Sequence, residues 1–160
     1  MGKFYHNIMV KKEYIRDGRA PIPRRETTSR VMSANRAKNT GPEIILRKEL
    51  RKEGISGARY HLVKIIGRPD IAFPKKRVAI FIHGCFWHRC PRCKMRLPKT
   101  HKKFWGEKFT RNKERDERKL HALKKLGWRP VIIWEHEIQG DVAKIAQKII
   151  RYLRRPLVKR

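Results

Sequence analysis

The sequence predicts a mixed α/β domain with a central β-sheet flanked by helices. Two short apolar segments, at residues 77–82 (RVAIFI) and 128–134 (WRPVIIW), have the composition of buried strands. Helical patterns stand before, between and after them, in the order helix, two or three strands, helix, strand, helix. Elements in this order pack as a sheet covered by helices. At 160 residues, the chain fits one compact domain with tails.

The two ends of the chain have the composition of tails. Residues 1–27 are basic and contain two helix-breaking prolines, so we expect an arm that is weakly ordered without a partner. The expected domain then spans residues 28–155, beginning with a short helix around residues 29–35. Residues 156–160 are expected to form a C-terminal tail.

The firmest helix is predicted to start at Thr40. Thr40 and Glu43 have the spacing of a capping box, in which each side chain hydrogen-bonds the backbone N–H of the other, and Pro42 stands in the first turn. Gly54 is the kind of residue that ends a helix. This capping role explains Glu43 fully without any catalytic role.

The remaining elements follow from apolar patterns and their breakers. The expected strands are residues 60–66, 70–73, 77–82 and 128–134. Pro130 has no backbone N–H, so the last of these strands should lie at a sheet edge or be unpaired there. Two helical stretches are expected at residues 102–109 and 111–126, and Asp141 can cap a last helix that runs to about Leu153.

The charge of the chain indicates a polyanionic partner. Lys and Arg total 43 against 14 Asp and Glu, which gives a net charge of +29. Such a charge opposes compaction unless a polyanion neutralises it, and nucleic acid is the obvious one, although charge alone fits a ribosomal or chromatin component equally well. No segment approaches the ~20 apolar residues of a membrane span, and the first residues lack the apolar core of a signal peptide. We therefore expect an intracellular protein with no membrane partner.

Three cysteines lie within nine positions of one another: Cys85, Cys90 and Cys93. In a reducing compartment this clustering favours a metal site over a disulfide. Zinc binds three thiolates well and takes a fourth ligand to complete a tetrahedron. The residues alone leave four candidates for that ligand, namely His88, His101, His121 and His136. A closed four-ligand site would be structural, because it leaves no open position for a substrate.

A second candidate site lies around Asp70. The turn GRPD at residues 67–70 is followed by a hairpin that brings Asp70 beside the end of strand 77–82, just before His83. The Asp70 carboxylate and a freed backbone carbonyl at Ile82 would be hard oxygen ligands of the kind that Mg²⁺ prefers. The alternative is that Asp70 is an ordinary turn residue.

Aromatic residues interrupt the cysteine-rich, basic loop. Phe86 and Trp87 lie between the cysteines, and Trp105 lies beyond them. Aromatic side chains in a basic loop are suited to stacking on nucleic-acid bases, whereas the alternative is ordinary packing. Residues 112–116 (NKERD) would by themselves be read as an exposed helix face with ion pairs.

Residues 67–93 (GRPDIAFPKKRVAIFIHGCFWHRCPRC) resemble the very short patch repair endonucleases, which carry a GRPD-type turn, a buried strand and HGCFWH. The segments MSANRAKNTGPE upstream and ERD…LGWRPVIIWE downstream extend the resemblance over about residues 30–138. The resemblance implies a restriction-endonuclease-like fold with a variant of the usual PD-(D/E)xK site. It also implies a Mg²⁺-dependent enzyme that nicks one strand of double-stranded DNA beside the T of a T:G mismatch.

The same resemblance implies catalytic roles for Asp70, His83, His88, Asp116 and Glu43. Asp70 would hold Mg²⁺ together with the carbonyl of Ile82, where some members have Thr, and the family pattern implies two ions. Asp116 would orient His88, the general base. His83 would contact the phosphate or the leaving group, and Glu43 would lie near the metal ions.

The resemblance also implies a zinc set and a DNA-contacting set. The zinc ligands would be Cys85, Cys90, Cys93 and His136, with Cys90 where many members have His and His136 where many have Cys. Imidazole and thiolate both suit zinc, so the exchange preserves one structural ion. The expected DNA-contacting residues are Phe86, Trp87, Trp105, Arg68 and Asn112. A monomer in the cytoplasm of a prokaryotic cell is expected.

Two rival functions stay open on the sequence. A nuclease of the same fold could act on another mismatch or on damaged or branched DNA. A non-catalytic, zinc-stabilised DNA-binding module would explain the charge, the cysteines and the tryptophans, but it would leave Asp70, His83, His88 and Asp116 without a role.

Overall fold

The computed structural model describes residues 38–156, so the predicted basic arm, the predicted short helix at 29–35 and the last four residues lie outside the described part of the chain. Its elements, in chain order, are α2 (Gly41–Lys52), β1 (Arg59–Tyr60), β2 (Ile71–Phe73), the 3-10 turn η1 (Pro74–Lys76), β3 (Val78–His83), α3 (Lys102–Lys125), β4 (Arg129–Trp134), α4 (Glu135–Gly140) and α5 (Val142–Arg154). Within these residues, no helix has the length and apolar composition that crossing a bilayer requires.

The four strands form one mixed sheet in the order β1-β2-β3-β4. β1, β2 and β3 are antiparallel neighbours, whereas β4 runs parallel to β3, with Ile82 opposite Ile133. Among the described residues β4 is therefore an edge strand, one of the two placements expected from Pro130, and the missing N–H of that residue interrupts no second ladder there. The predicted mixed α/β class is confirmed.

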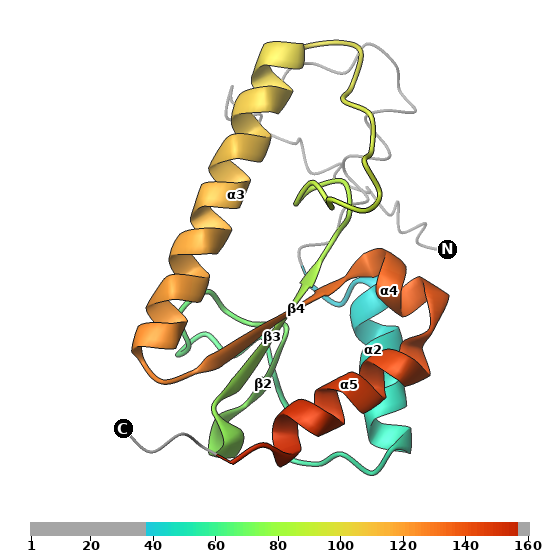
Figure 1. Ribbon diagram of the computed structural model, residues 1–160, viewed down its shortest axis with the longest axis vertical. Coiled ribbons are helices and arrows are strands. Elements are labelled where there is room, and N and C mark those ends of the chain that lie inside the picture. The colour runs from blue at the N-terminus through green and yellow to red at the C-terminus, as the bar shows by residue number, and fades with distance from the viewer. Residues whose placement is uncertain (1–37, 157–160) are drawn as a thin grey trace, which may run out of the picture.

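Helices cover the two faces of the sheet unequally (Figure 1). α3 lies along one face and extends well past the end of the strands, while α2, α4 and α5 pack on the other side. β3 is apolar at every position from 78 to 82 because both faces are covered, as is typical of central strands in α/β folds. The larger core joins the sheet to α2, α4 and α5 and contains Leu46, Leu50, Ile71, Phe73, Val78, Ile80, Val131, Ile133, Ile138, Ile145, Ala146, Ile149 and Leu153.

Three sequence-based expectations about elements were wrong. Residues 102–125 form one continuous helix instead of two, because neither proline nor a glycine turn interrupts the segment. Of the strand predicted at 60–66 only Tyr60 belongs to β1, since His61 has φ +49° and the chain then turns, with the Arg68 N–H bonded to the Ile65 carbonyl. α4 was not expected; the Glu137 carboxylate starts it by accepting the Trp134 N–H at 2.8 Å.

Ile149→Ala should lower the free energy of unfolding by about 2–5 kcal/mol, because it leaves a cavity at a fully buried position in α5. The measurement is urea denaturation followed by circular dichroism. Arg151→Ala, at an exposed position on the same helix, serves as the control and should change stability by less than about 0.5 kcal/mol. Equal losses in the two variants would contradict the placement of α5 against the sheet.

Candidate active site

Asp70 and the end of β3 meet at one edge of the sheet. Asp70 immediately precedes β2, and its Oδ2 accepts the backbone N–H of Ile82 at 2.7 Å. In an extended strand the N–H and C=O of one residue point to the same neighbour, so the Ile82 carbonyl faces the side of Asp70 as well. The antiparallel hairpin of β2 and β3 thus brings together the two groups that the sequence analysis paired.

The Asp70 carboxylate lies where a cation would stabilise it. Burial raises the pKa of Asp70 to about 6, and the nearby Glu43 carboxylate adds to the rise, while the Ile82 N–H and the positive charge of Arg47 act in the opposite direction. Within residues 38–156, no hydrogen bond to its Oδ1 is present. One oxygen is therefore left for a ligand. Ligand atoms of Asp70, Glu43 and His61 all lie within 4.8 Å of one another, so this donor set fits a divalent metal ion.

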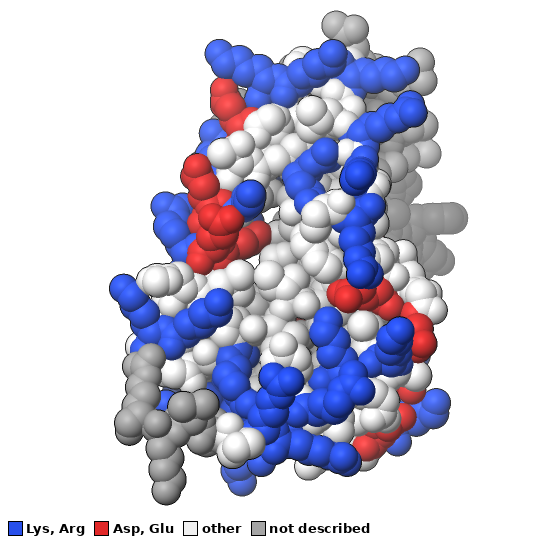
Figure 2. Space-filling model, in the orientation of Figure 1, with Lys and Arg blue, Asp and Glu red and all other residues white. Residues whose placement is uncertain are grey.

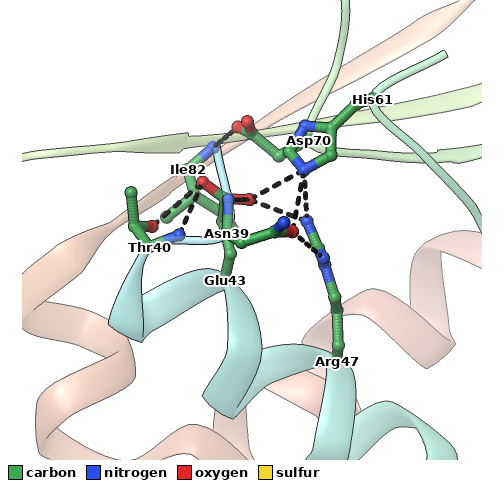
Figure 3. Close-up of polar contacts among 7 residues, drawn as sticks. All are labelled: Asn39, Thr40, Glu43, Arg47, His61, Asp70 and Ile82. Carbon is green, nitrogen blue, oxygen red and sulfur yellow. Dashed lines mark hydrogen bonds and ion pairs between the residues drawn. The ribbon is translucent and has the colours of Figure 1, made fainter. Parts of the chain in front are cut away.

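Glu43 is held by a network of its own (Figure 3). Its side chain is 3% exposed, and its carboxylate accepts the Asn39 N–H at 3.0 Å and the Thr40 hydroxyl at 3.0 Å. Arg47, one turn further along α2, donates to the same carboxylate at 2.7 Å, and His61 Nε2 lies 3.2 Å from it. Both the predicted capping box and a position near Asp70 are realised, and Glu43 is fixed by four neighbours beside any metal ion.

Two histidines and an aspartate form a second group of donors. His83 ends β3 and is 7% exposed, and its ring stacks on that of His88 with 3.9 Å between centroids. The Nδ1 of His88 is hydrogen-bonded to Asp116 of α3. Within the described residues, Nε2 of His88 has no hydrogen-bond partner, which leaves it for proton transfer.

Burial, hydrogen bonding and neighbouring charges shift the pKa values of His83 and Asp116. Burial, together with the charge of His88, lowers the pKa of His83 to about 4, so His83 is neutral near pH 7. Burial alone would raise the pKa of Asp116, but the hydrogen bond from His88 and the charges of both histidines outweigh it and lower that pKa. An ionised carboxylate is therefore placed to hold the His88 ring in one orientation.

The three cysteines and one histidine converge on a common point. Ligand atoms of Cys85, Cys90, Cys93 and His136 lie within 4.8 Å of one another. The Nδ1 of His136 lies 3.2 Å from the Cys85 sulfur and 3.6 Å from the Cys90 sulfur. Of the four histidines that the residues alone left open, the fold brings His136 to the cysteines, because α4 follows β4 directly. Three thiols and an imidazole are compatible with zinc.

The aromatic residues form a cluster between the loop and α3. Trp105 is 6% exposed, with ring centroids 5.8 Å from Phe86 and 6.1 Å from Trp87, which are both half-buried. Asn112 donates to the backbone carbonyl of Trp87 at 3.1 Å and so braces the loop, whereas Arg68 is exposed at the GRPD turn. In the protein alone, Trp105 is thus a packed residue.

Comparisons with known proteins identify the family of the chain. The family model for DNA mismatch endonuclease Vsr matches residues 22–94. The type II nicking enzyme V.NaeI of Lentzea aerocolonigenes is 39% identical over 137 residues, which cover 82% of each chain. The DNA mismatch endonuclease Vsr of Escherichia coli is 36% identical over 121 residues, 76% of this chain and 77% of that protein. The chain belongs to the Vsr endonuclease family.

As a member of the Vsr family, the protein is a DNA endonuclease. A further relative, the type II nicking enzyme V.XorIIP of Xanthomonas oryzae pv. oryzae, is 40% identical over 109 residues, 68% of this chain and 79% of that one. Figure 2 shows Lys and Arg spread widely over one face, with Asp and Glu gathered in a few small groups. A surface of this kind suits the phosphate backbone of DNA, which is the partner of a Vsr-family enzyme.

Sequence reasoning missed two residues of the candidate site, Arg47 and His61. Arg47 carried a signal, since Glu and Arg four residues apart on a helix form ion pairs. His61 carried none, because it lies outside every motif. Its Nε2 reaches 2.8 Å from Arg47 only because the chain takes a left-handed conformation at His61, which ends β1.

Proposed function

We propose that this protein nicks one strand of double-stranded DNA beside the T of a T:G mismatch and so starts very short patch repair. The observation that supports it most is the position of two different kinds of group at one end of β3. A buried carboxylate suited to a metal ion, Asp70, lies beside a histidine held by an aspartate, His88 with Asp116. Phosphodiester hydrolysis needs both charge stabilisation and proton transfer.

The proposed metal ions follow from the donor sets. Asp70 and the Ile82 carbonyl would hold Mg²⁺, with two ions in the full site and Glu43 reaching one of them through water. Bound Mg²⁺ would supply positive charge that polarises the phosphate and stabilises the leaving oxygen. Cys85, Cys90, Cys93 and His136 would hold one structural zinc ion that pins the loop. The fold that we propose for this arrangement is restriction-endonuclease-like.

The chain's own residues perform the proton transfer. His88 accepts a proton from the attacking water at Nε2, while Asp116 holds Nδ1 and stabilises the imidazolium that results. His83 is a neutral imidazole near pH 7 and is placed to hydrogen-bond the phosphate or the leaving oxygen. The stacked rings keep the two histidines on the same side of the reacting group.

Mismatch selectivity would come from the aromatic cluster. Inserting Phe86 and Trp87 between base pairs costs about a few kcal/mol of unstacking, and that cost is lowest at a mismatch. Trp105 is buried by Phe86 and Trp87, so its insertion requires the cluster to open. We further propose that the protein acts as a monomer in a prokaryotic cytoplasm, with an endonuclease domain at residues 28–155. In this proposal, residues 1–27 clamp the DNA backbone.

Asp116→Asn should lower the nicking rate by about 10²–10⁴-fold, because a neutral amide cannot stabilise the imidazolium that forms when His88 accepts a proton. Single-turnover nicking of an end-labelled duplex measures the effect. Glu117→Gln makes the same chemical change at the neighbouring, exposed position and should leave the rate unchanged. Equal nicking rates in the two variants would contradict the assignment of His88 as the general base.

The substrate is tested with end-labelled duplexes that differ by one base pair. One carries a single T:G mismatch, the others are fully paired or carry a different mismatch, and all are incubated with Mg²⁺. The proposal expects a nick beside the mismatched T and none in the paired duplex. Nicking of the paired duplex at a defined sequence would mean that the substrate is a paired sequence and not a T:G mismatch. The relatives that are named nicking enzymes favour this outcome. Tight mismatch binding without any nick would leave only a DNA-binding module.

A further inference from the structure

Lys119 lies on the face of α3 that packs toward the sheet. Asp116, Lys119, Leu120 and Leu123 have the i, i+3, i+4, i+7 spacing of a single helix face. Asp116 is hydrogen-bonded to His88, and Leu123 is fully buried against the sheet. Leu120 is partly buried and packs against the same apolar cluster as Leu123. Lys119 stands between them on this face, so the base of its half-buried side chain lies toward the sheet.

Contacts place the Lys119 side chain over the turn that leads to Asp70. A Cβ built on Gly67 would lie 3.3 Å from the Cβ of Lys119, so the lysine stem packs directly on the GRPD turn. Gly67 has φ +81°, and the same built Cβ would lie 3.2 Å from the ring of Phe81, so the turn also packs closely on β3. Three residues after this contact, the chain reaches the carboxylate of Asp70.

The Lys119 ammonium is influenced by the charges of Asp116 and Asp70 but forms an ion pair with neither. It is half-buried, yet within residues 38–156 no hydrogen bond or ion pair to it is present. Burial lowers its pKa, as does the charge of Arg115, while Asp116 and Asp70 oppose the change. Its charge also acts on His83. A partly desolvated cation that forms no ion pair with its acidic neighbours Asp116 and Asp70 gains little stability from them, so its position indicates a ligand that bears negative charge.

We propose that Lys119 is a further catalytic residue, whose ammonium contacts a non-bridging oxygen of the scissile phosphate from the α3 side of the site. This inference rests on the proposed function, because it uses the phosphate that Asp70 and His88 would act on. Negative charge grows on the non-bridging oxygens as water attacks, and a fixed cation there stabilises the transition state more than the bound substrate. Lys119 stays protonated throughout, so no proton changes place at this residue.

The test compares Lys119→Met with Arg118→Met, which removes the same charge from the neighbouring, exposed position of α3. Single-turnover nicking rates are measured at saturating protein, and duplex affinity is measured with Ca²⁺ in place of Mg²⁺. We expect Lys119→Met to nick about 10²–10³-fold more slowly, as on loss of one oxyanion donor, with an affinity equal to that of Arg118→Met. Lys119→Ala should be partly rescued by added propylamine, which a merely structural loss would not allow.

Other results would overturn the inference. Equal rates for Lys119→Met and Arg118→Met, with affinity lowered alike, would make Lys119 a contact to a flanking phosphate. A slow Lys119→Ala that propylamine does not rescue, with an altered circular dichroism spectrum, would make it a packing residue. The ratio between variants is taken on whichever duplex the wild-type protein nicks. If T:G is not the substrate, the proposed function is therefore contradicted, but the ratio of nicking rates between the two variants still tests the role of Lys119.

Discussion

Asp70→Asn should reduce nicking by at least about a thousandfold, since the loss of a metal ligand removes several kcal/mol of transition-state stabilisation and each ~1.4 kcal/mol is a factor of ten. The measurement is single-turnover nicking of a duplex that the wild-type protein cleaves. Asparagine can still accept the Ile82 N–H, so the hairpin is expected to persist. Retained duplex binding in the variant would show that the loss concerns chemistry.

The same variant should be more stable than the wild-type protein when Mg²⁺ is absent. The folded-state pKa of Asp70, about 6, lies above the ordinary value of 3.8. Near pH 7 the carboxylate is ionised in both states, and the folded state carries the penalty of burying it. Removing that charge should raise the free energy of unfolding by about 1–3 kcal/mol, whereas below pH 4 the two proteins should be alike. Thermal denaturation at both pH values checks this.

Added Mg²⁺ distinguishes this explanation from a simple packing effect. Mg²⁺ should raise the melting temperature of the wild-type protein, because a ligand that binds only the folded state stabilises it. It should leave Asp70→Asn unchanged. If Mg²⁺ stabilised both proteins equally, Asp70 would not be a ligand, and the buried carboxylate would need another explanation.

Cys90→Ala should abolish zinc binding and lower nicking by at least about 100-fold, because a structural zinc site contributes about 10–16 kcal/mol of apparent binding energy that orders its loop. That loop carries His88 only two positions before Cys90 and also carries Phe86 and Trp87. The zinc content of the purified protein and the nicking rate are measured together. His121→Ala, which changes an exposed histidine outside the cluster, should keep both.

Cys90→His provides the sharper comparison. Imidazole binds zinc as well as thiolate does, so this variant should retain one zinc ion and much of the activity that Cys90→Ala loses. A Cys90→Ala protein with full activity and no zinc would show that the cluster is not needed for the active site. Loss of activity in both variants, with zinc retained in each, would point to a role for the thiol itself.

The sequence alone determined the elements whose signals are local. The capping box at Thr40 and Glu43 and the N-cap at Asp141 depend on neighbours within one turn of helix, and all of these contacts form. The apolar run of β3 predicted a buried strand, and the missing N–H of Pro130 predicted a sheet edge or an unpaired position in β4, because burial and hydrogen-bonding capacity belong to the residues themselves. The family resemblance rested on equally local motifs.

Only the tertiary structure decided which distant residues meet. The choice of His136 among four histidines depends on β4 pairing parallel to β3, which brings α4 beside the cysteine loop. His61 itself adopts the left-handed conformation, which no sequence pattern predicted, and its side chain reaches Glu43. The same residue ends the strand that was expected to continue to position 66. Trp105 is expected at DNA by its motif, yet in the protein alone it packs against Phe86.

Lys119 illustrates why local sequence patterns predict some features and only the tertiary structure decides others. In the sequence it is one of many basic residues on a charged helix, where a lysine is ordinarily solvated. Its orientation follows from the burial of Leu123 and the bond between Asp116 and His88, and both depend on where α3 lies against the sheet. Local patterns record what each residue favours, whereas contacts across the fold depend on packing that no short segment contains.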